Sequence, residues 1–397
     1  MALATDDILL ATSFSGFYDK MRESFDTYFA YTTCEGSVLH FLNYRIIQSE
    51  YGTSVDQHNH IRQSILQQFF NKGTVVPFQS SPFILTQSIE MELFKDGPLS
   101  DEECATLDDR YNGTYSHWTG AILHIAEKSR WDLQYLGMRL AGYNNCPSAT
   151  CYRILYLGMC YLHHHPHVPI MFPSKPIKEK VPMKSHFAKG EAEISTKDYA
   201  QYTGLQAWPD AGFARDIVAS RRSTSSSIHT WGEVAFASQC VKQPEPAAST
   251  NDAEARSLFQ ATRRTLAYHS ILKSLDTTQT HPTPTHEDNV ATIAQVLNDR
   301  LTPRVKHIDV IISWINNQFG RDRMVPVPCP SELEKGDMNT KPHGGSTLQQ
   351  KFLPLVGFQF YPPPNSEHYT LLQLNEFEIG TYRGSFLLDK NKSPPKN

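Results

Sequence analysis

The sequence predicts an α/β protein in which a mixed five-stranded sheet with flanking helices follows an α+β front part. Three short stretches in the second half are strand candidates, and short turns join them, which suggests an antiparallel meander. A long stretch with helical spacing comes next, and two more strand patterns follow it among helical ones. Three consecutive strands followed by alternating helices and strands are typical of a mixed sheet with helices on its faces.

The expected elements can be given by residue range. In the second half, strands are expected at 205–208, 227–231, 234–236, 284–287 and 324–327, and helices at 253–275, 290–297 and 305–319. In the front part, we expect strands at 8–11, 39–47 and 54–56 and helices at 17–31 and 61–70. Two apolar stretches, 116–143 and 147–163, should pair as a helical hairpin across a turn-prone Asn-Asn-Cys-Pro segment.

A chain of 397 residues with 40% hydrophobic content can build two or three domains, each with its own core. The pattern divides it into an α+β unit at 1–70, a helical region at 71–165, a linker at 166–200, an α/β domain at 201–345 and a tail at 346–397. The linker is expected because lysine and proline are frequent between residues 166 and 182.

Charge and cysteine content restrict the class of protein. A formal net charge of −4 argues against a uniformly basic nucleic-acid binder. Seven cysteines, an odd number without a Cys-x-x-Cys pair, fit a reducing compartment, so we expect a cytoplasmic or nuclear protein that is not secreted. No apolar run approaches the roughly 20 residues of a membrane span, so we expect no membrane partner.

Four acidic residues lie where the predicted strands and the long helix begin or end. Asp210 follows the first strand, Glu254 is in the first turn of the long helix, Asp288 follows the fourth strand, and Asp337 lies beyond the fifth. Acidic oxygens at such positions can hold two hard divalent cations, one to activate water and one to stabilise a leaving oxygen. Most of the 41 acidic residues must be solvated surface, so position alone is weak support.

Six short motifs strengthen this interpretation. They are Pro-Asp-Ala-Gly-Phe-Ala at 209–214, Arg-Arg-Ser-Thr-Ser at 221–225, Ser-Thr-Asn-Asp-Ala-Glu at 249–254, Glu-Asp-Asn at 287–289, Lys-His-Ile-Asp at 306–309 and Gly-Asp-Met-Asn-Thr-Lys at 336–341. In this order they resemble the ribonuclease H region of copia-type retrotransposon Pol polyproteins. Gly212 departs from the family pattern, since it stands where the first motif has a second acid.

The resemblance implies a ribonuclease H-like domain that hydrolyses the RNA strand of RNA/DNA hybrids and leaves a 5′-phosphate and a 3′-hydroxyl. Carried over residue by residue, it implies that Asp210, Glu254, Asp288 and Asp337 bind two Mg²⁺ or Mn²⁺ ions. Asp252 stands at the place of the family's companion glutamate and also suits the start of a helix.

A hybrid duplex is held mainly through its phosphates, so basic and hydroxyl side chains near the acids are the expected contacts. The candidates are Arg221, Arg222, Ser223, Thr224, Ser225, Lys242 and Gln243. For the two arginines, a solvated hairpin tip is an equally good interpretation. Discrimination for RNA would come from contacts to the 2′-hydroxyls.

The front half resembles the same polyproteins more loosely. Asp6 and Asp7, followed by an apolar run, resemble the aromatic-x-Asp-Asp turn of a reverse-transcriptase palm. Residues 35–66 and 120–157 carry further similar segments, which implies a palm remnant at 1–70 and a thumb or connection region at 71–165. The rest of a Pol polyprotein is therefore an expected partner.

We expect no polymerase activity from this chain. Nucleotidyl transfer needs a third carboxylate from an earlier palm strand and fingers that hold the nucleotide, and the sequence begins after both. Purified protein should extend no primer on an RNA template; template-dependent incorporation would show that Asp6 and Asp7 have found a third acid.

Two alternatives remain open from the residues. The histidine-rich segment at 163–167 suggests a metal site, but adjacent imidazoles cannot converge on one ion without a sharply bent backbone. The second alternative concerns the whole chain: a catalytically inactive transposon remnant would act as a nucleic-acid-binding or interaction module. The presence of all four acids favours an active enzyme. Asn43, which stands where the family has a glycine, favours an inactive remnant.

Overall fold

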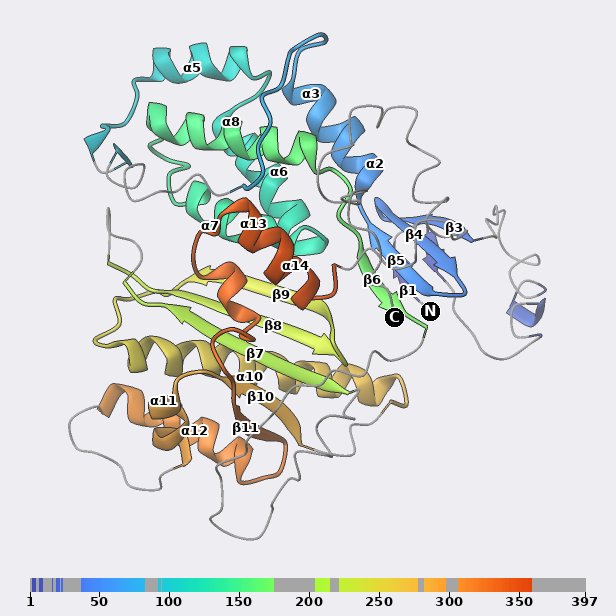
Figure 1. The fold of residues 1–397 in the computed structure, drawn as a ribbon, viewed down its shortest axis with the longest axis vertical. Coiled ribbons are helices and arrows are strands. Elements are labelled where there is room, and N and C mark those ends of the chain that lie inside the picture. The colour runs from blue at the N-terminus through green and yellow to red at the C-terminus, as the bar shows by residue number, and fades with distance from the viewer. Residues whose placement is uncertain are drawn as a thin grey trace, which may run out of the picture.

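A five-stranded mixed sheet forms the centre of the second half in the computed structural model of the chain (Figure 1). Its strands are β7 (Leu205–Gly212), β8 (Thr224–Trp231), β9 (Val234–Lys242), β10 (Thr283–Glu287) and β11 (Met324–Pro328). The structure describes residues 37–82, 92–93, 95–174, 204–214, 221–277, 282–297 and 306–358, and short pieces at 2–4, 7–9, 16, 19–21 and 23.

The strand order is β11-β10-β7-β8-β9, with β7 in the middle. The first three strands along the chain are antiparallel neighbours, because short connections return each strand beside the previous one. β10 and β11 run parallel to β7, and helices connect them. The expected mixed five-stranded sheet is confirmed, and β7, β8 and β9 are longer than the sequence pattern predicted.

One face of this sheet is covered by three helices, α10 (Thr250–Ser274), α11 (Val290–Leu297) and α12 (Lys306–Phe319) (Figure 1). The hydroxyl of Ser249 caps α10 by accepting from the backbone N–H of Asp252. Apolar side chains of α10, α11, α12 and β11 form one buried cluster, which includes Leu258, Ile315 and Met324. These helices match the ranges that apolar periodicity predicted.

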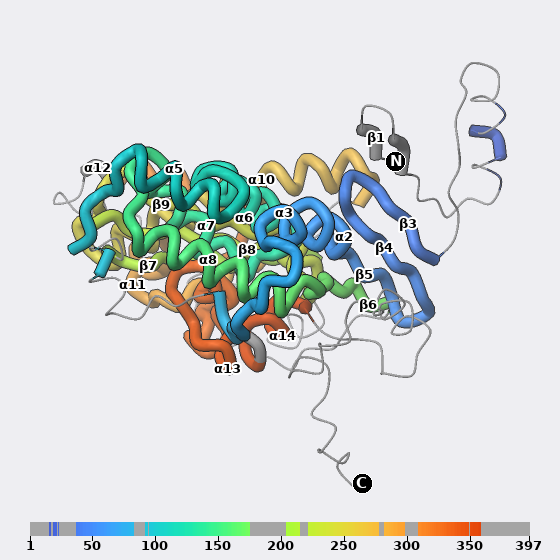
Figure 2. Tube along the Cα trace, turned by 90° about the horizontal axis from the view of Figure 1, so that it is seen from above, coloured from blue at the N-terminus to red at the C-terminus, as the bar shows by residue number. Residues whose placement is uncertain are grey.

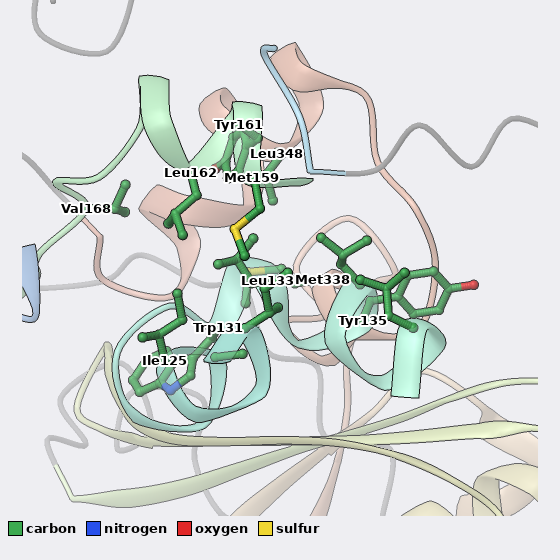
Figure 3. Close-up of a cluster of buried hydrophobic side chains, with 14 of the residues drawn as sticks. Ile125, Trp131, Leu133, Tyr135, Met159, Tyr161, Leu162, Val168, Met338 and Leu348 are labelled. Carbon is green, nitrogen blue, oxygen red and sulfur yellow. The ribbon is translucent and has the colours of Figure 1, made fainter. Parts of the chain in front are cut away.

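The helical region packs on the opposite face. It comprises α5 (Asp101–Arg110), α6 (Tyr115–Lys128), a 3-10 turn at Trp131–Leu133, α7 (Gln134–Ala141) and α8 (Ala149–His164). Figure 3 shows side chains of α6, α7 and α8 converging with Met338 and Leu348 above the sheet. Trp208 and Ile228 of the sheet belong to the same buried cluster. The helical region and the α/β region therefore share one core rather than forming separate ones.

Residues after 344 also contribute to this core. A short helical segment comprises α13 (Gly345–Thr347), a π-helical turn (Leu348–Phe352) and α14 (Leu353–Leu355). Leu348, Phe352 and Val356 are fully buried, and Phe358 lies edge-on to Trp131 with ring centroids 5.5 Å apart. The expected tail at 346–397 is therefore wrong for its first part, because apolar burial holds residues 345–358 in the core.

The hairpin expected at 116–163 is present, but its first helix is interrupted between α6 and α7. Arg130 and Asp132 form a buried ion pair of 2.7 Å, and the hydroxyl of Tyr161 donates to Asp132 at 2.7 Å. Arg130 also donates to the carbonyl of His165. Satisfying these buried charges requires a non-helical backbone at Arg130, and no periodicity pattern shows that requirement.

A four-stranded antiparallel sheet lies at one end of the molecule (Figure 2). It contains β3 (Val38–Phe41), β4 (Tyr44–Ser49), β5 (Gly52–Asp56) and β6 (Ile170–Pro173). The single strand expected at 39–47 is wrong: Leu42 and Asn43 adopt positive φ and form a two-residue turn. β6 comes from the expected linker at 166–200, so this segment returns to complete the sheet.

The remaining front elements are short. A continuous helical segment contains α2 (His58–His60), a π-helical turn (Ile61–Leu66) and α3 (Gln67–Phe69), close to the expected helix at 61–70. β1 (Ala2–Ala4) and β2 (Asp7–Leu9) pair as an antiparallel hairpin. Asp7 begins β2, whereas Asp6 and most of the expected helix at 17–31 lie outside the described residues. Within the described part, no helix combines the length and apolarity that crossing a membrane requires.

A buried ion pair anchors β4 to β5. Arg45 donates to both carboxylate oxygens of Asp56, and His167 lies 3.4 Å from the same carboxylate. Burial would raise the pKa of Asp56, but Arg45 and His167 hold it well below its usual range. Asp56→Ala is expected to lower the free energy of unfolding by about 3–5 kcal/mol, since it leaves a buried guanidinium unpaired.

Urea denaturation measures that loss. The matched control is Glu92→Ala, which breaks the exposed pair between Arg153 and Glu92 and should cost less than about 1 kcal/mol. Equal costs for the two variants would mean that the buried pair does not anchor the sheet.

Candidate metal centre

Three of the four predicted acids come together. Single carboxylate oxygens of Asp210, Glu254 and Asp288 all lie within 4.8 Å of one another. Asp210 is near the end of β7, Glu254 is in the first turn of α10, and Asp288 follows β10 directly. Oxygen atoms at this spacing can coordinate a divalent cation.

The fold explains why these side chains meet. β7 and β10 are parallel neighbours, so their carboxyl ends lie at the same edge of the sheet (Figure 1). The start of α10 is held against that edge by Ser257, whose Oγ lies 2.7 Å from the carbonyl of Asp210 and 2.8 Å from that of Ser226. Ser257 is one turn beyond Glu254, which brings the glutamate to the same edge.

Asp210 is buried and accepts a hydrogen bond from a neighbouring side chain. Its carboxylate is 5% exposed and accepts a hydrogen bond of 2.5 Å from the hydroxyl of Thr340. Burial raises the pKa of Asp210 to about 7, and the charges of Asp337 and Asp288 contribute in the same direction. A nearby cation would favour the ionised form of this carboxyl group.

Glu254 has an unsatisfied oxygen. The side chain is buried, and its Oε2 has no hydrogen-bond partner among the described residues. Burial raises the pKa of Glu254 well above its usual value, and the charges of Glu287 and Asp210 raise it further. A buried carboxylate oxygen without a donor is costly unless a proton or a cation satisfies it.

Asp288 connects the cluster to the surface. It is half-buried, and its Oδ2 accepts a hydrogen bond of 3.0 Å from the hydroxyl of Ser331. The other two acids are buried, so the side of Asp288 is where the carboxylate cluster is most open to solvent.

Asp337 lies at the margin of the group. It is in the 3-10 helix Gly336–Asn339, and its Oδ1 forms an ion pair of 2.5 Å with Lys341. It is not one of the three acids whose oxygens lie within 4.8 Å of one another. Its charge nevertheless raises the pKa of Asp210. The structure therefore places Asp337 near the predicted centre without bringing it into the tight group.

Two acids that the sequence interpretation missed are buried close by. Glu287 and Glu334 are at most 1% exposed, and an Oε2 atom of each has no hydrogen-bond partner among the described residues. Burial raises the pKa of both, and the charges of Asp210 and Asp288 raise it further. Glu287 could have been suspected because it adjoins Asp288 at the strand end. Glu334 carried no comparable signal in the sequence.

A buried hydrogen-bond network joins the loop after β11 to the helical region. The Nδ2 of Asn339 donates to Oε1 of Gln134 on α7 at 3.0 Å and to Oγ of Ser238 on β9 at 2.7 Å. Thr340, the next residue, is the donor to Asp210. His343 lies 2.8 Å, through Nε2, from the carbonyl of Asp337. Helix α7 thus helps to position the segment that contacts Asp210.

The predicted substrate contacts are only partly accessible. Ser223, Thr224, Ser225 and Gln243 are buried, so their side chains are not exposed to a phosphate in this structure, and their assignment as nucleic-acid contacts stays a prediction. Gln243 instead donates to Ser225 and to the carbonyl of Ala253, which holds β8 and β9 to the start of α10. Their polarity suggested a ligand contact, but it serves internal hydrogen bonds.

The basic candidates differ from the hydroxyl ones. Arg221 is exposed and has a positive φ of 54°, and Arg222 is half-buried. Lys242 is half-buried at the end of β9, with its Nζ directed towards Gly142 of the helical region. Asp252 is buried and accepts from Ala248 and Arg256, so it serves the start of α10.

The histidine-rich segment forms no common site. His164 and His165 lie 3.1 Å and 3.0 Å from the carbonyls of Val76 and Gln79, respectively. His167 faces Arg45 and Asp56. These three histidines have different polar partners, and none belongs to a metal-compatible group in the described ranges.

The donors at the acidic cluster fit a hard divalent cation. They are carboxylate oxygens, which Mg²⁺ and Mn²⁺ prefer. Three buried glutamates, Glu254, Glu287 and Glu334, each have an oxygen without a hydrogen-bond donor among the described residues. Searches for similar proteins gave no further guide, since no family model and no solved structure matches the chain.

Proposed function

We propose that this protein is a retroelement-type ribonuclease H that hydrolyses the RNA strand of RNA/DNA hybrids. The observation that carries the proposal is the convergence of Asp210, Glu254 and Asp288 at the carboxyl edge of β7 and β10. Three antiparallel strands followed by two parallel ones, with helices between them, fit the ribonuclease H-like fold that the six motifs imply. The loosely similar front half would then be a reverse-transcriptase palm and thumb remnant.

The carboxylates would hold two Mg²⁺ or Mn²⁺ ions, which supply an activated water and stabilise the leaving oxygen. Asp210 and Glu254 would bind the cations from the buried side, and Asp288 from the side open to solvent. Thr340 fixes the orientation of Asp210, and Ser331 that of Asp288. Lys341 forms an ion pair with Asp337 beside them.

Of the expected substrate contacts, Arg221 and Arg222 best fit phosphate binding. They precede β8, whose start is paired with the end of β7, and Arg221 is exposed. Guanidinium groups can bind phosphate oxygens in a bidentate manner. The partner would therefore be a hybrid duplex bound at the edge of the sheet where Asp288 is open.

The decisive experiment incubates purified protein with an end-labelled RNA/DNA hybrid and Mg²⁺. Cleavage confined to the RNA strand, absent with EDTA and absent for RNA/RNA and DNA/DNA duplexes, would support the proposal. Hybrid binding without cleavage would support the alternative of an inactive remnant that binds nucleic acid. Neither binding nor cleavage would exclude both.

A further inference from the structure

Glu334 is a buried carboxylate without a role in the proposed mechanism. It lies in the loop between β11 and the 3-10 helix that carries Asp337. Its side chain is 0% exposed, and its Oε1 accepts a hydrogen bond of 2.8 Å from the backbone N–H of Gly336. Its Oε2 has no hydrogen-bond partner among the described residues. One oxygen of this carboxylate is thus satisfied by the backbone, whereas within the described ranges the weak thiol donor of Cys329 is the side chain that interacts with the group.

The packing around Gly336 shows how close Glu334 is to Asp210. A Cβ on residue 336 would lie 2.7 Å from Cβ of Asp210, 3.0 Å from Oε1 of Glu334 and 3.1 Å from the carbonyl of Trp208. Both acidic side chains therefore pack close to the backbone at residue 336, and only glycine leaves room for both. This places Glu334 beside Asp210, although Glu334, like Asp337, is not one of the three acids whose oxygens lie within 4.8 Å of one another.

The neighbouring cationic groups have other partners as well. The ammonium of Lys335 donates to the carbonyl of Leu355 at 2.5 Å and lies 4.8 Å from the centre of the Trp208 ring. Lys341 is paired with Asp337. The charges that act most strongly on Glu334 are those of Asp210, Glu287 and Asp288, which all repel it and, together with burial, raise its pKa.

We infer that Glu334 is a further carboxylate of the cation site and binds a divalent cation together with Asp210. This inference rests on the proposed function, since it assumes that the cluster of Asp210, Glu254 and Asp288 binds cations. A buried carboxylate among like charges is unfavourable unless a positive charge compensates it. A hard cation such as Mg²⁺ or Mn²⁺ would satisfy the free Oε2, because carboxylate oxygen is its preferred protein ligand.

The test is the affinity of the full chain for Mn²⁺, measured by isothermal titration calorimetry. Glu334→Gln keeps an oxygen for the Gly336 N–H and removes the charge, and it is expected to weaken Mn²⁺ binding by about 10- to 100-fold. The matched control is Glu332→Gln, an exposed acid two residues away in the same loop, which should bind Mn²⁺ like the wild type. Glu334→Asp, which restores the charge on a shorter side chain, should bind Mn²⁺ more tightly than Glu334→Gln does.

Melting temperature in EDTA separates cation binding from a structural role. If Glu334 serves the cation, Glu334→Gln should melt in EDTA at the wild-type temperature or above it, because one repulsive charge is gone. Wild-type Mn²⁺ affinity in Glu334→Gln would overturn the inference, as would equal affinities of Glu334→Asp and Glu334→Gln. In either case the proposed function survives if Asp210→Asn still abolishes binding. A wild-type protein that binds no Mn²⁺ would instead remove the proposed function itself.

Discussion

The substitution Asp210→Asn is expected to lower the rate of hybrid cleavage by about a thousandfold or more. The substitution keeps the size of the side chain and an oxygen that can accept from Thr340, but it removes the charge at the centre of the carboxylate group. Cation ligation supplies several kcal/mol of transition-state stabilisation, and about 4 kcal/mol corresponds to three orders of magnitude in rate. The measurement is the initial rate of RNA-strand cleavage at saturating Mg²⁺.

Asp109→Asn provides the control for this experiment. It makes the same chemical change on an exposed residue of α5, remote in sequence from the cluster. It should retain the wild-type rate. Undiminished cleavage by the Asp210→Asn protein would mean that another site, or a contaminating nuclease, performs the reaction.

The second large effect concerns stability: Mg²⁺ should raise the melting temperature, and more at pH 8 than at pH 6. At 100 times its dissociation constant, a ligand that binds only the folded state adds about 2.7 kcal/mol of stability. For a chain of 397 residues that unfolds in one step, this corresponds to a shift of about 3 °C. Differential scanning fluorimetry with Mg²⁺ and with EDTA at each pH measures it.

The pH dependence follows from the raised pKa of Asp210. In the absence of cations the folded protein binds a proton on Asp210 that the unfolded chain has released. Stability of the metal-free protein therefore falls as pH rises from the ordinary pKa of 3.8 through the folded value of about 7. A cation must displace that proton at pH 6, which weakens its apparent affinity by about tenfold.

Buried histidines change the stability of the folded protein with pH in the opposite direction. The melting temperatures at the two pH values must therefore be compared with and without Mg²⁺. Burial lowers the pKa of His229 to about 3 and that of His165 to about 4. Each therefore destabilises the folded state as pH falls below its ordinary value of 6.5. Because this contribution is the same with Mg²⁺ and with EDTA, the difference between the two curves reports on the acidic cluster. A shift that is equal at both pH values, or unchanged in Asp210→Asn, would contradict the assignment.

Local patterns predicted the elements of the second half well. The strand candidate at residues 227–231 and the helical pattern at 290–297 each correspond in the structure to an element of the predicted type. These signals are local, because a strand or helix that buries one face must repeat its apolar residues with its own period. The strand at 39–47 failed because its alternation continues through a tight turn at Leu42 and Asn43.

Other errors arose where distant parts of the chain meet. β6 pairs with β5, which is more than a hundred residues earlier, and a Lys- and Pro-rich composition concealed it. The interruption between α6 and α7 depends on Asp132 and Tyr161, which come from different helices of the pair. The periodicity of each segment alone does not predict pairing between segments so far apart in the sequence.

In the candidate site, too, local patterns predicted some residues, whereas others depend on contacts between distant parts of the chain. Its three converging acids were expected from ordered motifs, because each stands at the end of a predictable strand or at the start of a predictable helix. Glu287 and Glu334 were missed, and Ser223, Ser225 and Gln243 were taken for ligand contacts although they are buried. The sequence does not show whether a polar side chain faces water, a ligand or the core.

The amino-acid sequence by itself determined the mixed sheet, the helices that cover one of its faces, and the positions of Asp210, Glu254 and Asp288 at element ends. Only the tertiary structure decided that the helical region shares a core with the sheet, that Asp337 pairs with Lys341, and that Glu334 is buried beside Asp210. The physical reason is that periodicity and capping act between residues a few positions apart. Burial and the charge that a carboxylate feels depend on neighbours from anywhere in the chain.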